Sequence, residues 1–302
     1  MNFQKSFFGG TSARCAAVAA GLLMVASGCG QLEFGGGSAV VPEVTFLPAD
    51  LIGDASESAA VESSADAGTE APSAGSGPGT FSGRVVLAGA PLTLAPLFVK
   101  GADIKDKEVC AAVDLPDERL VLGAENGVAN VFVYMKKAPK GAPKMSPPSE
   151  PLYFDQKNCR FLPRCLIVPI GQTVKVLSDD SIAHNTHTNP AKNNSVSSLV
   201  PANDRVGVLE LEYTRAEDPF SVTCDFHAWM KAYHLPLDHQ FGAVTDADGR
   251  FEITDIPAGE HEFVVWHESA AGNYVERKLS VMVKAGEVTN LDIEYAADKL
   301  SL

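Results

Sequence analysis

The sequence predicts an all-β protein in which two β-sandwiches follow one another along the chain. From residue 80 onward, short segments alternate between apolar and polar residues with a period of two. Turns rich in Gly, Pro, Asn and Asp separate these segments, and no stretch of ten residues has a convincing helical pattern. Antiparallel sandwiches are built from strands of this kind. The preceding residues lack such a pattern, and we expect a disordered linker there.

The first 28 residues have the organisation of an export signal. Lys5 and Arg14 give a positive start, residues 15–25 form an apolar run, and Ala-Ser-Gly precedes Cys29. The run is too short to cross a hydrocarbon layer of about 30 Å as a helix. Ala-Ser-Gly-Cys also resembles the bacterial lipobox, which implies that Cys29 is lipidated and becomes the first residue of an exported, membrane-anchored protein. An ordinary secretory signal with a coincidental Cys is the alternative.

Residues 29–79 are expected to form a lipidated, acidic linker. Residues 30–79 contain no Lys or Arg, eight acidic residues and two aromatic ones. Such a composition buries too little apolar surface to offset the entropy lost on ordering. The net charge of the chain is −14, which argues against binding to nucleic acid because phosphates require cationic patches.

Residues 80–238 are expected to form the first sandwich. Phe81, Gly83, Val85 and Leu87 alternate with Ser82, Arg84 and Val86, and later segments repeat such patterns. We expect its strands to include residues 81–87, 128–135, 173–177, 209–213 and a strand that ends at residue 224.

Residues 239–302 are expected to form a second, smaller sandwich. Two strands flank the turn Asp246-Ala-Asp248-Gly249, in which the Gly suits a positive φ. The turns and strands between residues 244 and 263 resemble the carboxypeptidase regulatory-like, transthyretin-like domain, which implies a β-sandwich. Asp246 and Asp248 do not predict a calcium site, because the remaining ligand spacing of an EF-hand is missing.

The segment at residues 220–230, in which a predicted strand ends at Cys224, carries metal-binding chemistry. Cys224 is followed after three residues by His227 and after three more by Met230. Type 1 copper centres require one thiolate, two imidazoles and a weak axial thioether. The second imidazole must come from elsewhere, and His184, just after the predicted strand at residues 173–177, can supply it.

This spacing, with an upstream His-Asn pair, resembles the cupredoxins, especially their amicyanin and plastocyanin-like members. The runs Asp-Gln-Lys-Asn-Cys-Arg-Phe and His-Asn-Thr-His-Thr-Asn-Pro are also similar to methylamine-utilisation-like exported proteins. The resemblance implies a Greek-key sandwich and one copper ion, with His184, Cys224 and His227 as equatorial ligands and Met230 as the axial ligand. Asn185 would then brace the ligand loop through hydrogen bonds.

Two alternatives concern the same residues. His187 could replace His184, although the His-Asn match favours His184. Cys224 could instead form a disulfide, since four Cys residues of the exported chain remain after Cys15 and Cys29 are accounted for. If Cys224 binds copper, Cys110 and Cys159 are left as a disulfide and Cys165 as an odd thiol, with Cys159–Cys165 as a competing pair.

The sequence therefore predicts a type 1 copper protein that is anchored by lipid and carries single electrons. We expect a redox protein partner in the cell envelope, attachment to a membrane through the lipid, and no nucleic-acid partner. We expect no enzyme, because neither a Ser-His-Asp set nor paired carboxylates are present in a catalytic pattern. A non-metal carbohydrate-binding or adhesion sandwich is the alternative from another class, and copper storage or sensing is a third.

Overall fold

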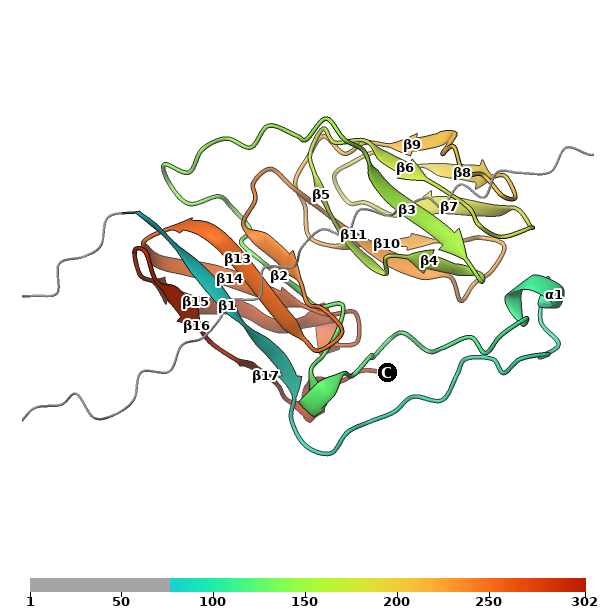
Figure 1. The fold of residues 1–302 in the computed structure, drawn as a ribbon, viewed down its shortest axis with the longest axis horizontal. Helices are drawn as coiled ribbons and strands as arrows, with labels where there is room; N and C mark the ends of the chain where they lie inside the picture. Colours follow the sequence, from blue (N-terminus) through green and yellow to red (C-terminus); the bar gives the residue numbers. More distant parts are fainter. Residues whose placement is uncertain (1–76) are drawn as a thin grey trace, which may run out of the picture. The chain divides into compact units, whose positions relative to one another are not determined.

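The computed structural model describes residues 77–302, and these fold almost entirely into β-strands (Figure 1). The predicted signal peptide, the lipidation site Cys29 and nearly all of the predicted linker lie outside this part. The helical segments of the described residues are one short α-helix and three 3-10 turns. They are α1 (Lys107–Cys110), η2 (Ala124–Asn126), η3 (Ala271–Asn273) and η4 (Ala297–Lys299). None of the described helices has the length and apolar character needed to cross a membrane.

The first module consists of two sheets that share one core. One sheet has the strand order β5-β11-β10-β7-β8 and the other has the order β4-β3-β6-β9. Most neighbouring strands are antiparallel as predicted, but the pairs β5–β11 and β3–β6 are parallel. The strands are β3 (Leu152–Lys157), β4 (Arg160–Leu162), β5 (Cys165–Pro169), β6 (Val174–Val176), β7 (His184–Thr188), β8 (Ser197–Val200), β9 (Leu209–Leu211), β10 (Phe220–Thr223) and β11 (Lys231–Leu237).

The second module also has two sheets around its own core. The strand β1 lies between β13 and β16 and also pairs with β17, while the other sheet has the order β12-β2-β14-β15. The strands are β1 (Pro78–Leu87), β2 (Phe132–Tyr134), β12 (Gly242–Val244), β13 (Arg250–Pro257), β14 (Gly259–Trp266), β15 (Tyr274–Val283), β16 (Val288–Asn290) and β17 (Ile293–Tyr295).

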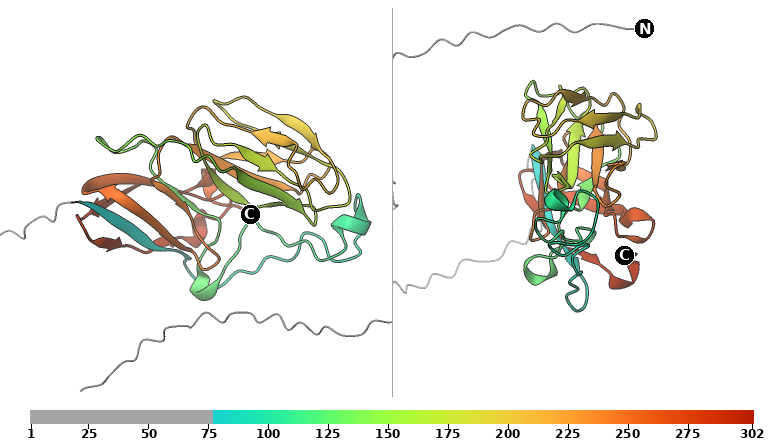
Figure 2. Two further views of the ribbon diagram at one scale, coloured as in Figure 1. Left: turned by 45° about the horizontal axis from the view of Figure 1, so that its top comes forward. Right: turned by 90° about the vertical axis from the view of Figure 1, so that its right-hand side faces the viewer.

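The strands β1 and β2 belong to the second module, whereas the sequence analysis assigned both to the first sandwich. Phe81 pairs with Ile253 and Phe132 pairs with Trp266, so each strand pairs with residues that are more than a hundred positions away in the sequence. Figures 1 and 2 show β1 beside β13, although their different colours mark them as far apart in the sequence. Phe81 and Val85 are fully buried, which confirms the alternation predicted for β1, but a period of two does not indicate which sheet a strand joins.

The turn at residues 246–249 is present, but it joins two sheets and closes no hairpin. Gly249 has a φ of +77°, and its amide donates to the carbonyl of Asp246 at 3.0 Å. The Asp246 carboxylate accepts from the amides of Asp248 and Arg250, and the Asp248 carboxylate accepts from the amide of Ala124. The Asp246 side chain therefore stabilises the turn and the Asp248 side chain joins it to the loop at Ala124, while β12 pairs with β2 and β13 with β1.

A long excursion between β1 and β2 reaches from the second module to the first. We call residues 97–115 the strap. Its two arms are joined by backbone hydrogen bonds, among them Leu97 to Leu115 at 2.9 Å and Gly101 to Ala111 at 2.8 Å. The helix α1 lies at its tip, and Figure 1 shows the chain running out from β1 to α1 and returning.

Candidate metal centre

The pairing of β7 with β10 brings the predicted ligands to one edge of the first module. Thr223, the last residue of β10, pairs with His187, so the chain beyond β10 passes the start of β7, where His184 lies. The following loop is tight: the amide of Cys224 donates to the carbonyl of Met230 at 3.3 Å, and the amide of Met230 donates to the carbonyl of His227 at 2.9 Å. The fold therefore places His227 back over Cys224.

Three ligand atoms converge at this edge. The Nδ1 atoms of His184 and His227 are 3.0 Å apart, and the Cys224 sulfur lies 3.7 Å from His227 Nδ1. All three atoms lie within 4.8 Å of one another, and the three residues are at most 2 % exposed. With metal–N and metal–S lengths of about 2.0 and 2.3 Å, ligands of one ion lie about 2.8 to 3.8 Å apart. The spacing observed for these pairs fits a single bound ion.

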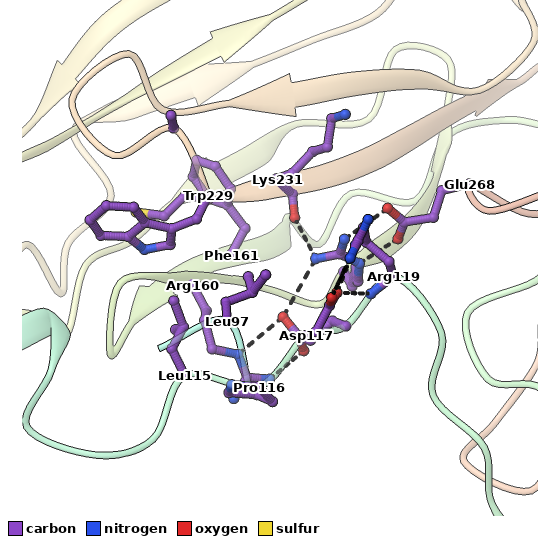
Figure 3. Close-up of a pocket in the computed structure, with 14 residues that line it drawn as sticks. Leu97, Leu115, Pro116, Asp117, Arg119, Arg160, Phe161, Trp229, Lys231 and Glu268 are labelled. Carbon is purple, nitrogen blue, oxygen red and sulfur yellow. Dashed lines mark hydrogen bonds and ion pairs between the residues drawn. The ribbon is translucent and has the colours of Figure 1, made fainter. Parts of the chain in front are cut away.

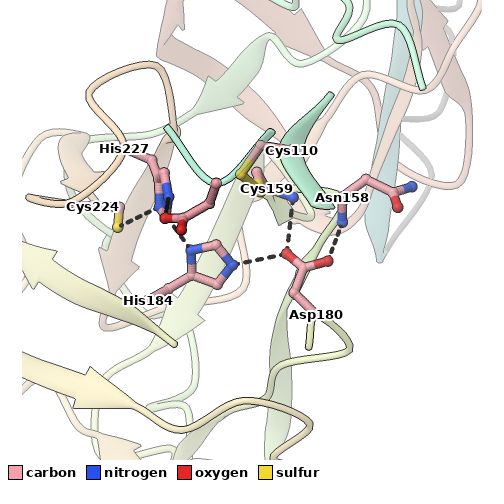
Figure 4. The surroundings of a disulfide bond; sticks show 8 residues. Cys110, Asn158, Cys159, Asp180, His184, Cys224 and His227 are labelled. Carbon is pink, nitrogen blue, oxygen red and sulfur yellow. Dashed lines mark hydrogen bonds and ion pairs between the residues drawn. A yellow bond between two sulfur atoms is a disulfide. The ribbon is translucent and has the colours of Figure 1, made fainter. Parts of the chain in front are cut away.

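Each imidazole binds a carboxylate through its outer nitrogen, so its Nδ1 atom faces the other ligands. His184 Nε2 lies 2.8 Å from a carboxylate oxygen of Asp180 (Figure 4), and His227 Nε2 lies 2.9 Å from a carboxylate oxygen of Asp106. A carboxylate only accepts, so each Nε2 carries the hydrogen. The two Nδ1 atoms then face each other at 3.0 Å, an arrangement that either a proton on one of them or a cation between them stabilises.

The protonation equilibria of the same residues favour a thiolate beside a positive charge. Burial raises the pKa of the Cys224 thiol, but hydrogen bonding by His184 and then His227 outweighs it and brings the pKa to about 6. Burial lowers the pKa of His184, but hydrogen bonding to Asp180 and Cys224 outweighs that effect and raises the pKa to about 9. The site therefore stabilises the charge distribution that a thiolate-bound cation needs.

Met230 is buried in the core of the first module, and Asn185 contacts the loop that carries Cys224. Met230 is 1 % exposed and belongs to the core cluster that contains Cys224. The Asn185 side chain donates to the Asp225 carboxylate at 2.7 Å and accepts from the Asp225 amide at 2.6 Å. It thus ties β7 to the residue that follows Cys224.

His187 is not brought to the other ligands. Its side chain is 33 % exposed, and its Nδ1 lies 2.9 Å from the Asp225 carboxylate. His184 and His187 are three residues apart on β7, and a strand turns such residues to opposite faces. The period of two therefore separates the two candidates that the sequence analysis left open.

Sequence reasoning missed the two carboxylates. Asp180 is four residues before His184 and also accepts from the amides of Asn158 and Cys159 at 2.6 and 2.9 Å. An acid so close to a candidate ligand was a usable local signal. Asp106 is 121 residues from His227, and nothing in its neighbourhood along the chain points to a metal centre.

The cysteines follow the predicted assignment. Cys110 and Cys159 form a disulfide, so the competing pair of Cys159 with Cys165 is not formed. Cys165 and Cys224 are the free thiols of the described residues, and both are buried. Burial raises the pKa of Cys165 well above its ordinary value, and its sulfur contacts the carbonyl of Asn130. Cys165 is therefore an inert neutral thiol, unlike Cys224.

A pocket of about 230 Å³ lies on the other side of the ligand loop (Figure 3). Trp229 lines it, and the Trp229 ring centroid is 5.2 Å from that of His227. Arg164 donates to both carboxylate oxygens of Glu268, at 2.5 and 2.8 Å, and to the carbonyl of Lys231 at 3.1 Å. This buried ion pair joins the second module to the end of the ligand loop.

Comparisons with known proteins found similarity to parts of the chain. Residues 221–291 match the family model described as polysaccharide lyase family 4, domain II, and not the carboxypeptidase regulatory-like domain expected from the sequence. No curated protein sequence matches the chain.

Among solved structures, a copper-containing nitrite reductase from Thermus scotoductus has 17 % identity and a TM-score of 0.27, over 34 % of this chain and 25 % of the reductase. A purple cupredoxin from Nitrosopumilus maritimus has 21 % identity and a TM-score of 0.24, over 28 % and 99 %. Amicyanin from Paracoccus versutus has 12 % identity and a TM-score of 0.25, over 36 % and 99 %. The chain thus spans about a quarter of the nitrite reductase.

Proposed function

We propose that the protein binds one copper ion at His184, Cys224 and His227, with Met230 as a weak axial ligand, and that it carries single electrons. The observation that supports this most is the convergence of two imidazole Nδ1 atoms and a thiolate sulfur in a buried site. Two His and one Cys with a long axial Met are the ligand set of electron-transfer copper centres, whereas structural zinc sites use four strong ligands.

The chain's own residues supply rigidity. The imidazoles are fixed by carboxylates on their outer nitrogens, and the ligand loop is closed by its own backbone hydrogen bonds. Copper in such a site would change its oxidation state with little movement of the ligands. The burial of the three ligands supports a carrier and not an enzyme.

The location of the protein is part of the proposal. The N-terminal signal and Cys29 support export and a lipid anchor on an envelope membrane. The redox partner would then be another envelope protein. The net charge of −14 supports the absence of a nucleic-acid partner.

Copper loading of the purified protein tests the proposal, and the two free thiols provide a matched pair of variants. We expect one Cu(II) per chain and an intense thiolate-to-copper absorption band. Cys224→Ser should abolish the band because a hydroxyl cannot replace the thiolate, while Cys165→Ser should keep it because Cys165 lies away from the cluster. Folded wild-type protein that takes up no copper, or a band lost equally in both variants, would refute the copper site.

A groove in the second module favours a second function, the binding of an acidic carbohydrate. The groove has a volume of about 950 Å³, and Tyr274 forms part of its wall with Arg277 over the ring at 3.9 Å. Five Lys or Arg residues and only two acidic ones line it, although the chain as a whole is acidic: Lys136, Lys137, Lys140, Arg277 and Lys278 against Glu260 and Glu262. The name of the matched family, a polysaccharide lyase domain, is consistent with this candidate.

Binding to polygalacturonate, with neutral dextran as the comparison, tests the second function. A Lys137→Glu and Lys140→Glu double variant should weaken binding, because both side chains line the groove. Lys284→Glu is the control, since Lys284 is exposed outside the groove and pairs with Glu287. Equal binding of acidic and neutral polymers, or equal effects of both changes, would exclude it.

A further inference from the structure

The strap covers the imidazole of His227, the later of the two candidate histidine ligands in the sequence. His227 is fully buried, and its outer nitrogen meets the carboxylate of Asp106, which precedes α1 at the tip of the strap. Phe98 of the strap packs edge-on against Trp229, with ring centroids 5.2 Å apart, and Trp229 lies beside His227. The strap, which follows β1 in the sequence, therefore covers the outer side of the His227 ring.

The backbone at Asp106 shows that this position is built for a particular type of residue. Its φ is +53° and its ψ is +38°, in the left-handed region that most side chains avoid. Asp and Asn are the non-glycine residues that tolerate this region best. The conformation directs α1 so that Cys110 reaches Cys159 while the Asp106 carboxylate remains on His227.

The disulfide joins the supports of both imidazoles. Cys110 ends α1, four residues after Asp106, and its partner Cys159 donates its backbone amide to Asp180 at 2.9 Å. Asp180 in turn holds His184. Figure 4 shows this chain of contacts running from the disulfide to Asp180 and His184. One covalent bond thus links the segment that supports His227 with the segment that supports His184.

We propose that Asp106 is a positioning residue for the metal and that the strap makes the centre a closed one, an inference that rests on the proposed copper site. The carboxylate fixes the hydrogen of His227 on Nε2, so that Nδ1 is free to bind the metal. The carboxylate also makes the imidazole a stronger electron donor to the metal. This stabilises the more highly charged oxidised metal and lowers its reduction potential. The strap keeps water and outside ligands from this imidazole.

The substitution Asp106→Asn tests the positioning role, because Asn tolerates the same backbone conformation but carries no charge. We expect the affinity for Cu(II) to fall by about 10- to 100-fold, as for other outer partners of metal ligands. The affinity for Cu(I) should fall less, so the reduction potential should rise in proportion to the logarithm of the ratio of the two fold-changes. Asp103→Asn is the matched control, since Asp103 lies on the same strap with an exposed side chain that pairs with Lys107 at 3.2 Å.

The strap itself is tested by removing its disulfide. The double variant Cys110→Ser and Cys159→Ser should lose copper to a strong chelator faster than wild type, because α1 is no longer held over His227. Circular dichroism of each variant reports whether it folds.

The outcomes separate the two proposals. Wild-type protein that binds no copper would refute the proposed function and this inference with it. Copper binding by wild type, with Asp106→Asn equal to Asp103→Asn in both affinities and in potential, would refute the role of Asp106 alone. An unchanged rate of copper loss in the double variant would refute the closure by the strap.

Discussion

Replacing Asp180 by Ala should destabilise the protein strongly even without metal. The Asp180 carboxylate is 4 % exposed and receives three hydrogen bonds, from His184 Nε2 at 2.8 Å and from the amides of Asn158 and Cys159 at 2.6 and 2.9 Å. The change to Ala leaves three donors without a partner in or near the core. Each buried donor left unpaired costs about 1 to 3 kcal/mol, and relaxation recovers part of the sum. We expect a loss of about 3 to 5 kcal/mol.

The neighbouring Asp179 provides the control for this measurement. Its carboxylate is 42 % exposed and pairs with Lys157 at 2.7 Å, a surface ion pair that contributes little to stability. Urea unfolding of the metal-free variants at neutral pH gives both free energies directly. If Asp180→Ala and Asp179→Ala differed by less than about 1 kcal/mol, the carboxylate would not be the support of the site that its contacts indicate.

Four further predictions concern an axial ligand, a buried ion pair, a buried histidine and the expected lipid anchor. Met230→Leu should keep copper but shift its reduction potential, because an axial thioether tunes the metal more than it holds it; loss of copper in a titration would contradict this. Arg164→Leu should cost about 3 to 5 kcal/mol in thermal unfolding, because it leaves Glu268 buried without its partner, whereas the exposed Arg205→Ala should cost less than about 1. Burial lowers the pKa of His234 to about 3, so the folded state keeps it neutral while the unfolded chain binds a proton below the ordinary value of 6.5. The free energy of unfolding should therefore fall as the pH drops from about 6.5 toward 3, and His234→Phe should reduce this slope by about 1.4 kcal/mol per pH unit; equal slopes in urea titrations would contradict it. Cys29→Ser should release the protein from the membrane fraction, since the lipid is its expected anchor, and a processed variant that still sediments with membranes would count against lipidation.

The local part of the candidate centre could be predicted from the sequence. Cys224, His227 and Met230 lie within one short loop, and their spacing of three residues lets that loop fold back on itself. The all-β class followed from the period of two, which depends only on neighbouring residues. The disulfide between Cys110 and Cys159 could be named only as one of two possibilities, because a pairing depends on which loops meet in space.

The tertiary structure decided everything that depends on distant segments. The alternation of β1 is visible in the sequence, but its place beside β13 results from pairing and packing with residues that lie far along the chain. The sequence also left His184 and His187 open, and the face of β7 resolved the choice, because only His184 points into the core. The closure of His227 by Asp106 could not be foreseen: hydrogen bonds across 121 residues leave no local pattern, since each partner needs only to be correctly placed in the folded chain.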